Sequence, residues 1–94
     1  WKRHREMTLN LVVPVGKIRF VLFDDRKLPK AKFQEVVISK DSYYRLTIPP
    51  KIWVGFQGLS DGVSMLLNIA NIEHNPEEAD IKDIKDIEFK WEGL

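Results

Sequence analysis

Proline and glycine turns cut this sequence into short β-type runs, and this punctuation limits its fold more than any other feature. The firmest break is Pro49-Pro50, because proline cannot donate a hydrogen bond to a central sheet ladder. Turn signals about eight to twelve residues apart are typical of a β-sandwich or barrel. No crossover helix is visible, which excludes a parallel α/β sheet. An all-β fold is therefore predicted, with strands over residues 8–13, 17–23, 33–39, 43–48, 52–57 and 63–70.

The expected strands differ in how deeply they should be buried. Residues 17–23 (KIRFVLF) alternate regularly, with every second residue from Ile18 on one side, so a half-buried strand is predicted. Residues 63–70 (VSMLLNIA) are more continuously apolar, which indicates a central strand. Pro14 is expected to end the first strand.

The C-terminal part carries the one helix signal in the chain. Asn75-Pro76-Glu77-Glu78 has the features of a helix start, namely an asparagine cap, an early proline and acidic residues at the positive end of the dipole. A short C-terminal helix or an irregular arm is expected to follow over Ile81 and Ile84. Ile87, Phe89 and Trp91 then alternate, which predicts a final strand.

Length and composition bound the possible functions. The chain has 94 residues, which predicts one domain over residues 1–94. Its net charge of +1 indicates no whole-molecule attraction to nucleic acid or to an anionic membrane. No apolar run reaches the ~18 residues of a membrane-spanning helix. The chain contains no cysteine, which fits a reducing compartment, so a cytoplasmic location is expected.

Lys2 and His4 form a candidate pair near the start of the sequence. They share one side of an extended segment, since strand side chains alternate, and together they favour an anionic ligand or an enolate. A solvated basic N-terminal end is the alternative. His74 is the second of two histidines and stands far from His4 in the sequence, so no metal site is predicted. Neither a glycine-rich phosphate loop nor a nucleophile elbow is present.

Two aromatic residues and one amide are the further candidates for ligand contact. Trp53 and Phe56 flank Gly55 after the double proline, so their rings could stack on a base or a sugar face. They could instead plug the end of a barrel, which is the preferred interpretation for Phe56. Asn68 interrupts an apolar run and needs hydrogen-bond partners, either within the scaffold or in a pocket.

Four segments resemble a known family. IPPKIWVGF followed by QGLSD resembles the proline-rich turn of the RmlC-like cupins, the dTDP-4-dehydrorhamnose 3,5-epimerases and related sugar-nucleotide ketoisomerases. GKIRFVLFDDR, VISKDSYYRL and NPEE agree with the same pattern, and the spacing matches over residues 1–78. The resemblance implies a cupin-type jelly-roll barrel with the ligand in its mouth, usually dimeric. The family pattern begins before Trp1, so the chain is expected to lack an N-terminal portion of the family fold.

The family's catalytic residues match this sequence poorly. Its histidine base, enolate-stabilising lysine and tyrosine acid fall on Lys2, Leu9 and Leu67. A histidine of its proline-rich turn falls on Val54. His4 falls on the second histidine of the His-x-His found in the ketoisomerases, and is therefore the remaining family acid/base.

The resemblance implies a sugar-nucleotide epimerase or isomerase of the dTDP-4-keto-6-deoxy-sugar type, acting in surface polysaccharide sugar biosynthesis. Such an enzyme needs no metal and no cofactor, and its partners would be a nucleotide-sugar ligand and a second copy. His4 would be the proton shuttle and Lys2 its electrostatic helper. The expected substrate-binding residues are Trp53, Asn68, Arg26 and His74. A degenerate cupin that binds a sugar or nucleotide without turnover, or a structural dimerisation domain, remains the alternative.

Overall fold

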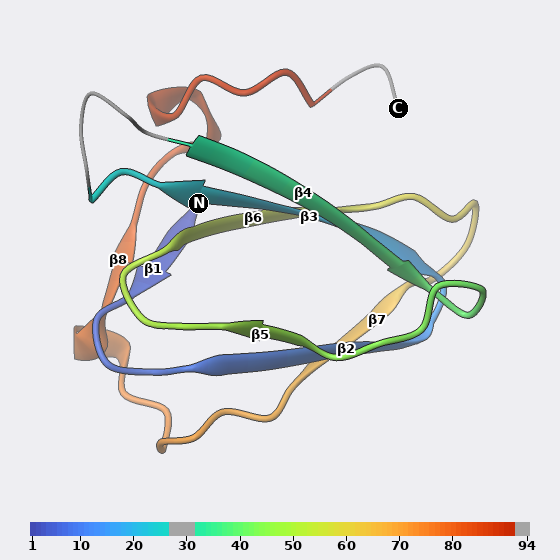
Figure 1. Ribbon diagram of the computed structural model, residues 1–94, viewed down its shortest axis with the longest axis horizontal. Coiled ribbons are helices and arrows are strands. Elements are labelled where there is room, and N and C mark those ends of the chain that lie inside the picture. Colours follow the sequence, from blue (N-terminus) through green and yellow to red (C-terminus); the bar gives the residue numbers. More distant parts are fainter. Residues whose placement is uncertain (27–31, 92–94) are drawn as a thin grey trace.

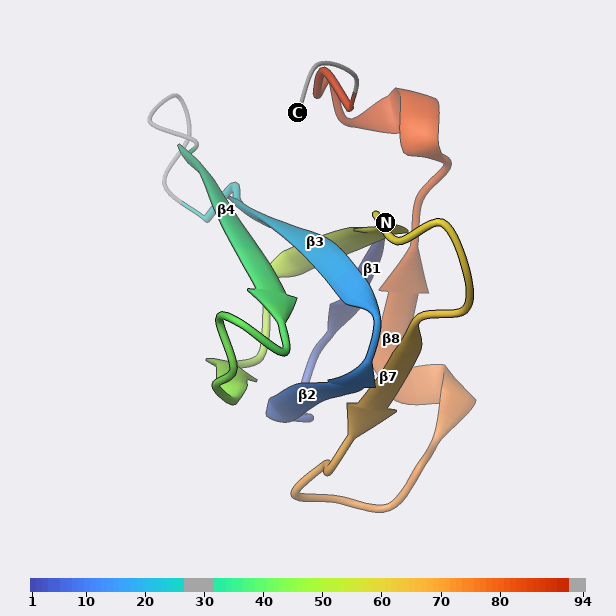
Figure 2. The same ribbon diagram turned by 90° about the vertical axis from the view of Figure 1, so that its right-hand side faces the viewer.

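The computed structural model describes residues 1–26 and 32–91, which form two antiparallel sheets that face each other (Figures 1 and 2). The larger sheet has the strand order β4-β3-β6-β1-β8, and the smaller has the order β5-β2-β7. The strands are β1 Lys2–His4, β2 Leu9–Val15, β3 Lys17–Asp24, β4 Lys32–Ser39, β5 Leu46–Ile48, β6 Trp53–Gly58, β7 Met65–Asn68 and β8 Ala79–Ile81. The predicted all-β class is confirmed.

Pro14 does not end the first strand, contrary to the sequence prediction. β2 continues through Pro14 to Val15, and its pairing with β7 shifts register between Val12 and Val15. A proline fits at such an irregularity because the ladder needs no hydrogen bond from its nitrogen there. Gly16 then turns the chain into β3 with a positive φ of 83°, where a side chain would be strained.

β7 lies at the edge of the smaller sheet, whereas its apolar sequence predicted a central strand. Leu66 packs against the core between the sheets. Met65 and Leu67 face outward and are about half exposed, at 46% and 48%. A continuous apolar run therefore reflects one buried face and one uncovered apolar face, and the sequence pattern does not distinguish this from a strand buried on both faces.

The C-terminal part forms an arm with two single-turn 3-10 helices. Asn75 caps the first, η1 (Pro76–Glu78), by accepting a hydrogen bond from the Glu77 amide at 3.1 Å, as the sequence predicted. β8 and the second turn, η2 (Ile84–Asp86), follow. The prediction of a final strand over residues 87–91 is wrong, because these residues form no strand. Their alternating apolar side chains instead pack on the outer face of the larger sheet.

Two apolar clusters lie on the two faces of the larger sheet. The inner cluster fills the space between the sheets and contains Met7, Leu9, Leu11, Val13, Ile18, Phe20, Ile38, Ile48, Ile52 and Val54. The outer cluster is aromatic and is centred on Trp1, Val21, Trp53 and Ile87, with Phe23, Phe89 and Trp91 packed against it. β6 contributes to both, since consecutive residues of a strand point to opposite faces.

Candidate functional site

A cavity of about 170 Å³ lies between the two sheets and brings together four candidate residues from the sequence, namely Lys2, His4, Phe56 and Asn68. We call it the His4 cavity. It is lined by Lys2, His4, Leu9, Leu11, Val54, Phe56, Leu66 and Asn68. The predicted pairing of Lys2 with His4 on one side of an extended segment is thus confirmed, because both belong to β1 and both line this cavity. Asn68 faces them from β7.

The double-proline turn holds β1 in place behind the cavity. Lys51, directly after Pro49-Pro50, adopts a left-handed backbone conformation with φ 73°. Its amide donates a 2.7 Å hydrogen bond to the carbonyl oxygen of His4. A non-glycine residue with this φ carries backbone strain, which the surrounding contacts must offset. The double-proline turn therefore fixes the backbone of His4.

Glu78 lies behind His4 and is the buried acidic group of the site. Its Oε1 contacts Nδ1 of His4, and its Oε2 accepts hydrogen bonds from the backbone amides of Glu6 at 3.1 Å and Met7 at 3.2 Å. Burial raises the pKa of Glu78, but hydrogen bonds from His4 and from the two amides, together with the imidazolium charge, outweigh it and lower the pKa to about 2. Glu78 is therefore a carboxylate at neutral pH.

The sequence did not identify Glu78 as part of a site. NPEE was interpreted as a helix start and as part of the family pattern, and the helix-start interpretation holds for Asn75 and Glu77. Glu78 follows them and is 5% exposed, although glutamate is rarely buried without a partner. That partner, His4, stands 74 residues away along the chain, so no local pattern could reveal the pair.

The positions of Trp53 and Phe56 reverse the roles that the sequence suggested, ligand contact for Trp53 and a buried plug for Phe56. Trp53 is 1% exposed and lies on the outer face of the sheet, where Arg3 and Lys82 stand over its ring at 4.5 and 4.8 Å from the ring centroid. Its indole nitrogen donates to Asp25 at 3.2 Å. Trp53 therefore cannot stack on a ligand in the His4 cavity. Phe56 lines that cavity and is 60% exposed, because it lies on the opposite face of β6.

Arg26 and His74 do not join Lys2 and His4. Arg26 follows β3 and its guanidinium pairs with Asp24, at 2.8 Å for both nitrogen–oxygen contacts. His74 is exposed in the segment before η1. Neither residue lines the His4 cavity, because each lies in a connection outside the facing sheets.

The positions that correspond to the family's other acid/base groups carry apolar side chains, and one of these side chains points away from the His4 cavity. Leu9 and Val54 line the cavity. Leu67 faces outward, so the residues of β7 that reach the cavity are Leu66 and Asn68. The Asn68 side-chain oxygen accepts a 3.1 Å hydrogen bond from the Asn10 amide. Both interpretations of Asn68 therefore apply, since it supports the sheet and also lines the cavity.

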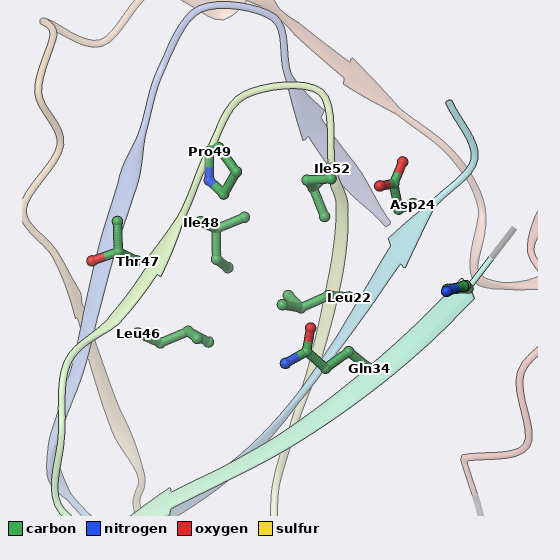
Figure 3. A pocket seen from close by; sticks show the side chains of 9 residues that line it. Leu22, Asp24, Gln34, Leu46, Thr47, Ile48, Pro49 and Ile52 are labelled. Carbon is green, nitrogen blue, oxygen red and sulfur yellow. The ribbon is translucent and has the colours of Figure 1, made fainter. Parts of the chain in front are cut away.

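A second cavity, of about 330 Å³, lies where the edge strands β4 and β5 face each other (Figure 3). Figure 3 shows apolar side chains from both sheets around it, with the amide of Gln34 and the carboxylate of Asp24 also on its wall. Leu22, Leu46, Ile48, Pro49 and Ile52 make up the apolar part. Neither of the two predicted catalytic residues lines this cavity, so we place the candidate site at His4.

Metal-binding clusters and membrane-spanning helices are absent from residues 1–26 and 32–91. This part of the chain contains no group of three or more histidine, aspartate or glutamate side chains placed to hold a metal ion. It also contains no helix with the length and apolarity needed to cross a bilayer.

Comparison with known proteins finds the same fold in a dTDP sugar isomerase. No protein-family model matches the chain. A solved dTDP sugar isomerase from Desulfovibrio desulfuricans G20 superimposes with a TM-score of 0.87 and 34% identity, covering 100% of this chain and 63% of the isomerase. A probable low-salt glycan biosynthesis epimerase, Agl13, from Haloferax volcanii is 29% identical over 83 residues, which span 85% of this chain and 53% of that protein.

The chain therefore spans between about half and two thirds of the length of these two proteins. Its predicted resemblance to dTDP-sugar epimerases and isomerases is confirmed, and so is the predicted cupin-type fold.

Proposed function

We propose that this chain, as a relative of the dTDP-sugar isomerases, forms the proton-transfer site of a sugar-nucleotide epimerase or isomerase acting on a dTDP-4-keto-6-deoxy sugar. One observation carries the proposal. The His4 imidazole lines a cavity between the sheets and is backed by the Glu78 carboxylate. An imidazole supported in this way can act as a general base and then as a general acid.

The proposed reaction is a proton shift next to a ketone. His4 removes the proton from the carbon beside the carbonyl, the C–H electron pair moves toward the carbonyl oxygen, and an enolate forms. The Lys2 ammonium, on the same side of β1, stabilises the negative oxygen. The proton then returns to the opposite face of the same carbon, or to a neighbouring carbon. No metal or cofactor takes part in these steps.

The same cavity offers groups for substrate binding. The Asn68 amide can hydrogen-bond a sugar hydroxyl, and Phe56 takes the stacking role first assigned to Trp53. Arg26 and His74 remain proposed contacts for parts of the ligand that extend beyond the cavity. A nucleotide sugar is larger than about 170 Å³, so only its reacting ring would enter.

The cellular setting is part of the proposal. The absence of cysteine supports a place in the cytoplasm, and the resemblance supports a role in surface polysaccharide sugar biosynthesis as a homodimer. The outward side chains of β7 support the dimer, because residues 63–72 carry no charge in a chain with 31% charged residues. A twofold contact through this stretch would bring no like charges together, and it would cover the exposed Met65 and Leu67.

Binding without turnover is the second candidate function, and a specific observation favours it. Leu9 and Val54 put apolar side chains where the family has a lysine and a histidine, and Leu67, at the tyrosine position, points away from the cavity. A third, structural role in dimerisation would need no ligand at all.

Solvent exchange separates these functions. The protein is incubated in D2O with a dTDP-4-keto-6-deoxy sugar, and C3 and C5 are followed by NMR. We expect deuterium at one or both carbons, with loss of exchange in His4→Asn. The control Glu77→Gln changes an exposed side chain outside the His4 cavity and should keep the wild-type rate. Ligand binding without exchange would favour the binding role, and absence of binding would exclude both.

A further inference from the structure

We infer that Glu78 is a positioning residue that keeps the proton of neutral His4 on Nδ1, so that Nε2 faces the cavity with a free lone pair. The proposed function supplies only the catalytic consequence of this inference. The arrangement of the two side chains can be tested without any substrate.

The contacts of the imidazole set its orientation. Nδ1 of His4 meets Oε1 of Glu78, and Glu78 is not among the residues that line the His4 cavity. His4 itself lines the cavity, and its side chain is only 11% exposed. The ring edge with Nδ1 is therefore turned away from the cavity, and the opposite edge, with Nε2, faces it. Within the described residues, Nε2 makes no hydrogen bond to another side chain or to the backbone.

Glu78 is itself fixed, so it imposes the proton position on the imidazole. Oε2 accepts hydrogen bonds from two backbone amides in the turn between β1 and β2, those of Glu6 and Met7. The Glu78 carbonyl oxygen also accepts from the Arg5 amide at 2.8 Å, and this second anchor holds the backbone. An ionised carboxylate can only accept hydrogen bonds, so the proton between Glu78 and His4 must come from Nδ1.

The tautomer decides what His4 can do. With its proton on Nδ1, neutral His4 presents an acceptor to the cavity and can remove a proton from carbon. With its proton on Nε2, it would present a donor and could not act as a base. In serine proteases, an amide in place of the carboxylate behind the histidine gives the wrong tautomer and lowers kcat by roughly 10⁴.

Glu78→Gln makes the inference testable, because the carboxamide keeps the size of the side chain. The amides of Glu6 and Met7 both require an oxygen, so the carboxamide oxygen should remain with them. Its NH₂ group then faces His4 and donates to Nδ1. The proton of neutral His4 should therefore move to Nε2. Glu77→Gln is the matched control, because Glu77 is its exposed neighbour.

Histidine-selective ¹⁵N labelling and long-range ¹H–¹⁵N correlation spectra measure the tautomer directly. Spectra are recorded at about pH 8, above the ordinary histidine pKa of ~6.5, and His74→Asn assigns the signals. We expect a protonated Nδ1 and an unprotonated Nε2 for His4 in the wild type and in Glu77→Gln, with the two signals exchanged in Glu78→Gln. A wild-type His4 with its proton on Nε2, or an even mixture, overturns the inference even if the variant does not fold.

A folded Glu78→Gln variant that keeps the wild-type tautomer also overturns the inference. The substrate experiment adds a separate readout, since Glu78→Gln should lower the rate of deuterium exchange by roughly 10²–10⁴-fold with a smaller change in KM. A wild type with the expected tautomer but no exchange would contradict the proposed function and leave the role of Glu78 in place.

Discussion

The two faces of the larger sheet differ in what covers them. The outer face lies under the C-terminal arm, and its centre, Trp53, is enclosed between Arg3, Lys82 and neighbouring aromatic rings. A Cβ on Gly55 would come within 2.8 Å of the Trp91 ring, so the arm packs directly on the backbone of β6. The inner face packs against the smaller sheet around the apolar core, but the His4 cavity remains beside β1. Phe56 lies at the exposed rim of this cavity.

Because of this difference, alternate residues of one strand serve different purposes. Those on the outer face contribute to stability, and those on the inner face line the candidate site. On β6, Trp53 belongs to the covered face, while Val54 and Phe56 belong to the cavity face. On β1, Arg3 lies over Trp53, while Lys2 and His4 line the cavity. Neighbouring residues should therefore respond to substitution in opposite ways, the outer ones through unfolding and the inner ones through ligand binding and turnover.

Trp53→Ala should have the largest effect on stability. It removes a fully buried ring, its hydrogen bond to Asp25 and its contacts with two cations, at a cost of about 3–5 kcal/mol in the free energy of unfolding. This is a large share of the stability of so small a domain. Urea unfolding measures it, and Trp53→Phe, which keeps an aromatic ring, should lose clearly less. A loss below about 1 kcal/mol for Trp53→Ala would mean that the outer cluster contributes little.

Glu78 should make the cavity side of the molecule sensitive to acid. Its pKa is lowered from 4.5 to about 2 in the folded protein, so the folded state favours the carboxylate. The resulting stability is fully present above about pH 4.5 and is lost as the pH falls toward 2. Full loss corresponds to up to about 3 kcal/mol. Glu78→Gln has no such titration, so the difference in unfolding free energy between wild type and variant should shrink over this range. A constant difference would contradict the assignment.

The local sequence pattern predicted which side chains lie on the inner face of the larger sheet, but it did not predict that the outer face is buried as well. The alternation of residues 17–23 correctly placed Phe20 toward the core, and the alternation of β1 correctly joined Lys2 with His4. The same alternation predicted that β3 would be half-buried, yet Arg19 and Val21 on its other side are also buried. Arg19 is held by Glu35 at 2.8 Å and by the Trp91 carbonyl at 2.7 Å.

The missing information was long-range in each case. The outer face is covered because residues 84–91 fold back over it, which no pattern within β3 or β6 reveals. Trp53 and Phe56 are three positions apart in the predicted strand 52–57, which puts them on opposite faces. Only the fold showed which of these faces carries the cavity. Glu78 likewise became part of the site through contact with a strand at the other end of the chain. Strands and turns follow from local chemistry, whereas the partners of each face follow from topology.

Phe56→Ala should change stability least and is the sharpest test of the contrast. The ring is mostly exposed, so its removal should cost within about 1 kcal/mol, far less than removal of Trp53 three positions earlier. It should still weaken binding of a dTDP sugar by about two- to tenfold, since an aromatic contact is worth about 0.5–1.5 kcal/mol. Calorimetric titration with a dTDP sugar measures this. Tyr43→Ala is the matched control, because Tyr43 is similarly exposed and does not line the His4 cavity. Equal binding by the wild type, Phe56→Ala and Tyr43→Ala would mean that Phe56 has no role in the site. A stability loss for Phe56→Ala as large as that for Trp53→Ala would contradict the distinction between the two faces.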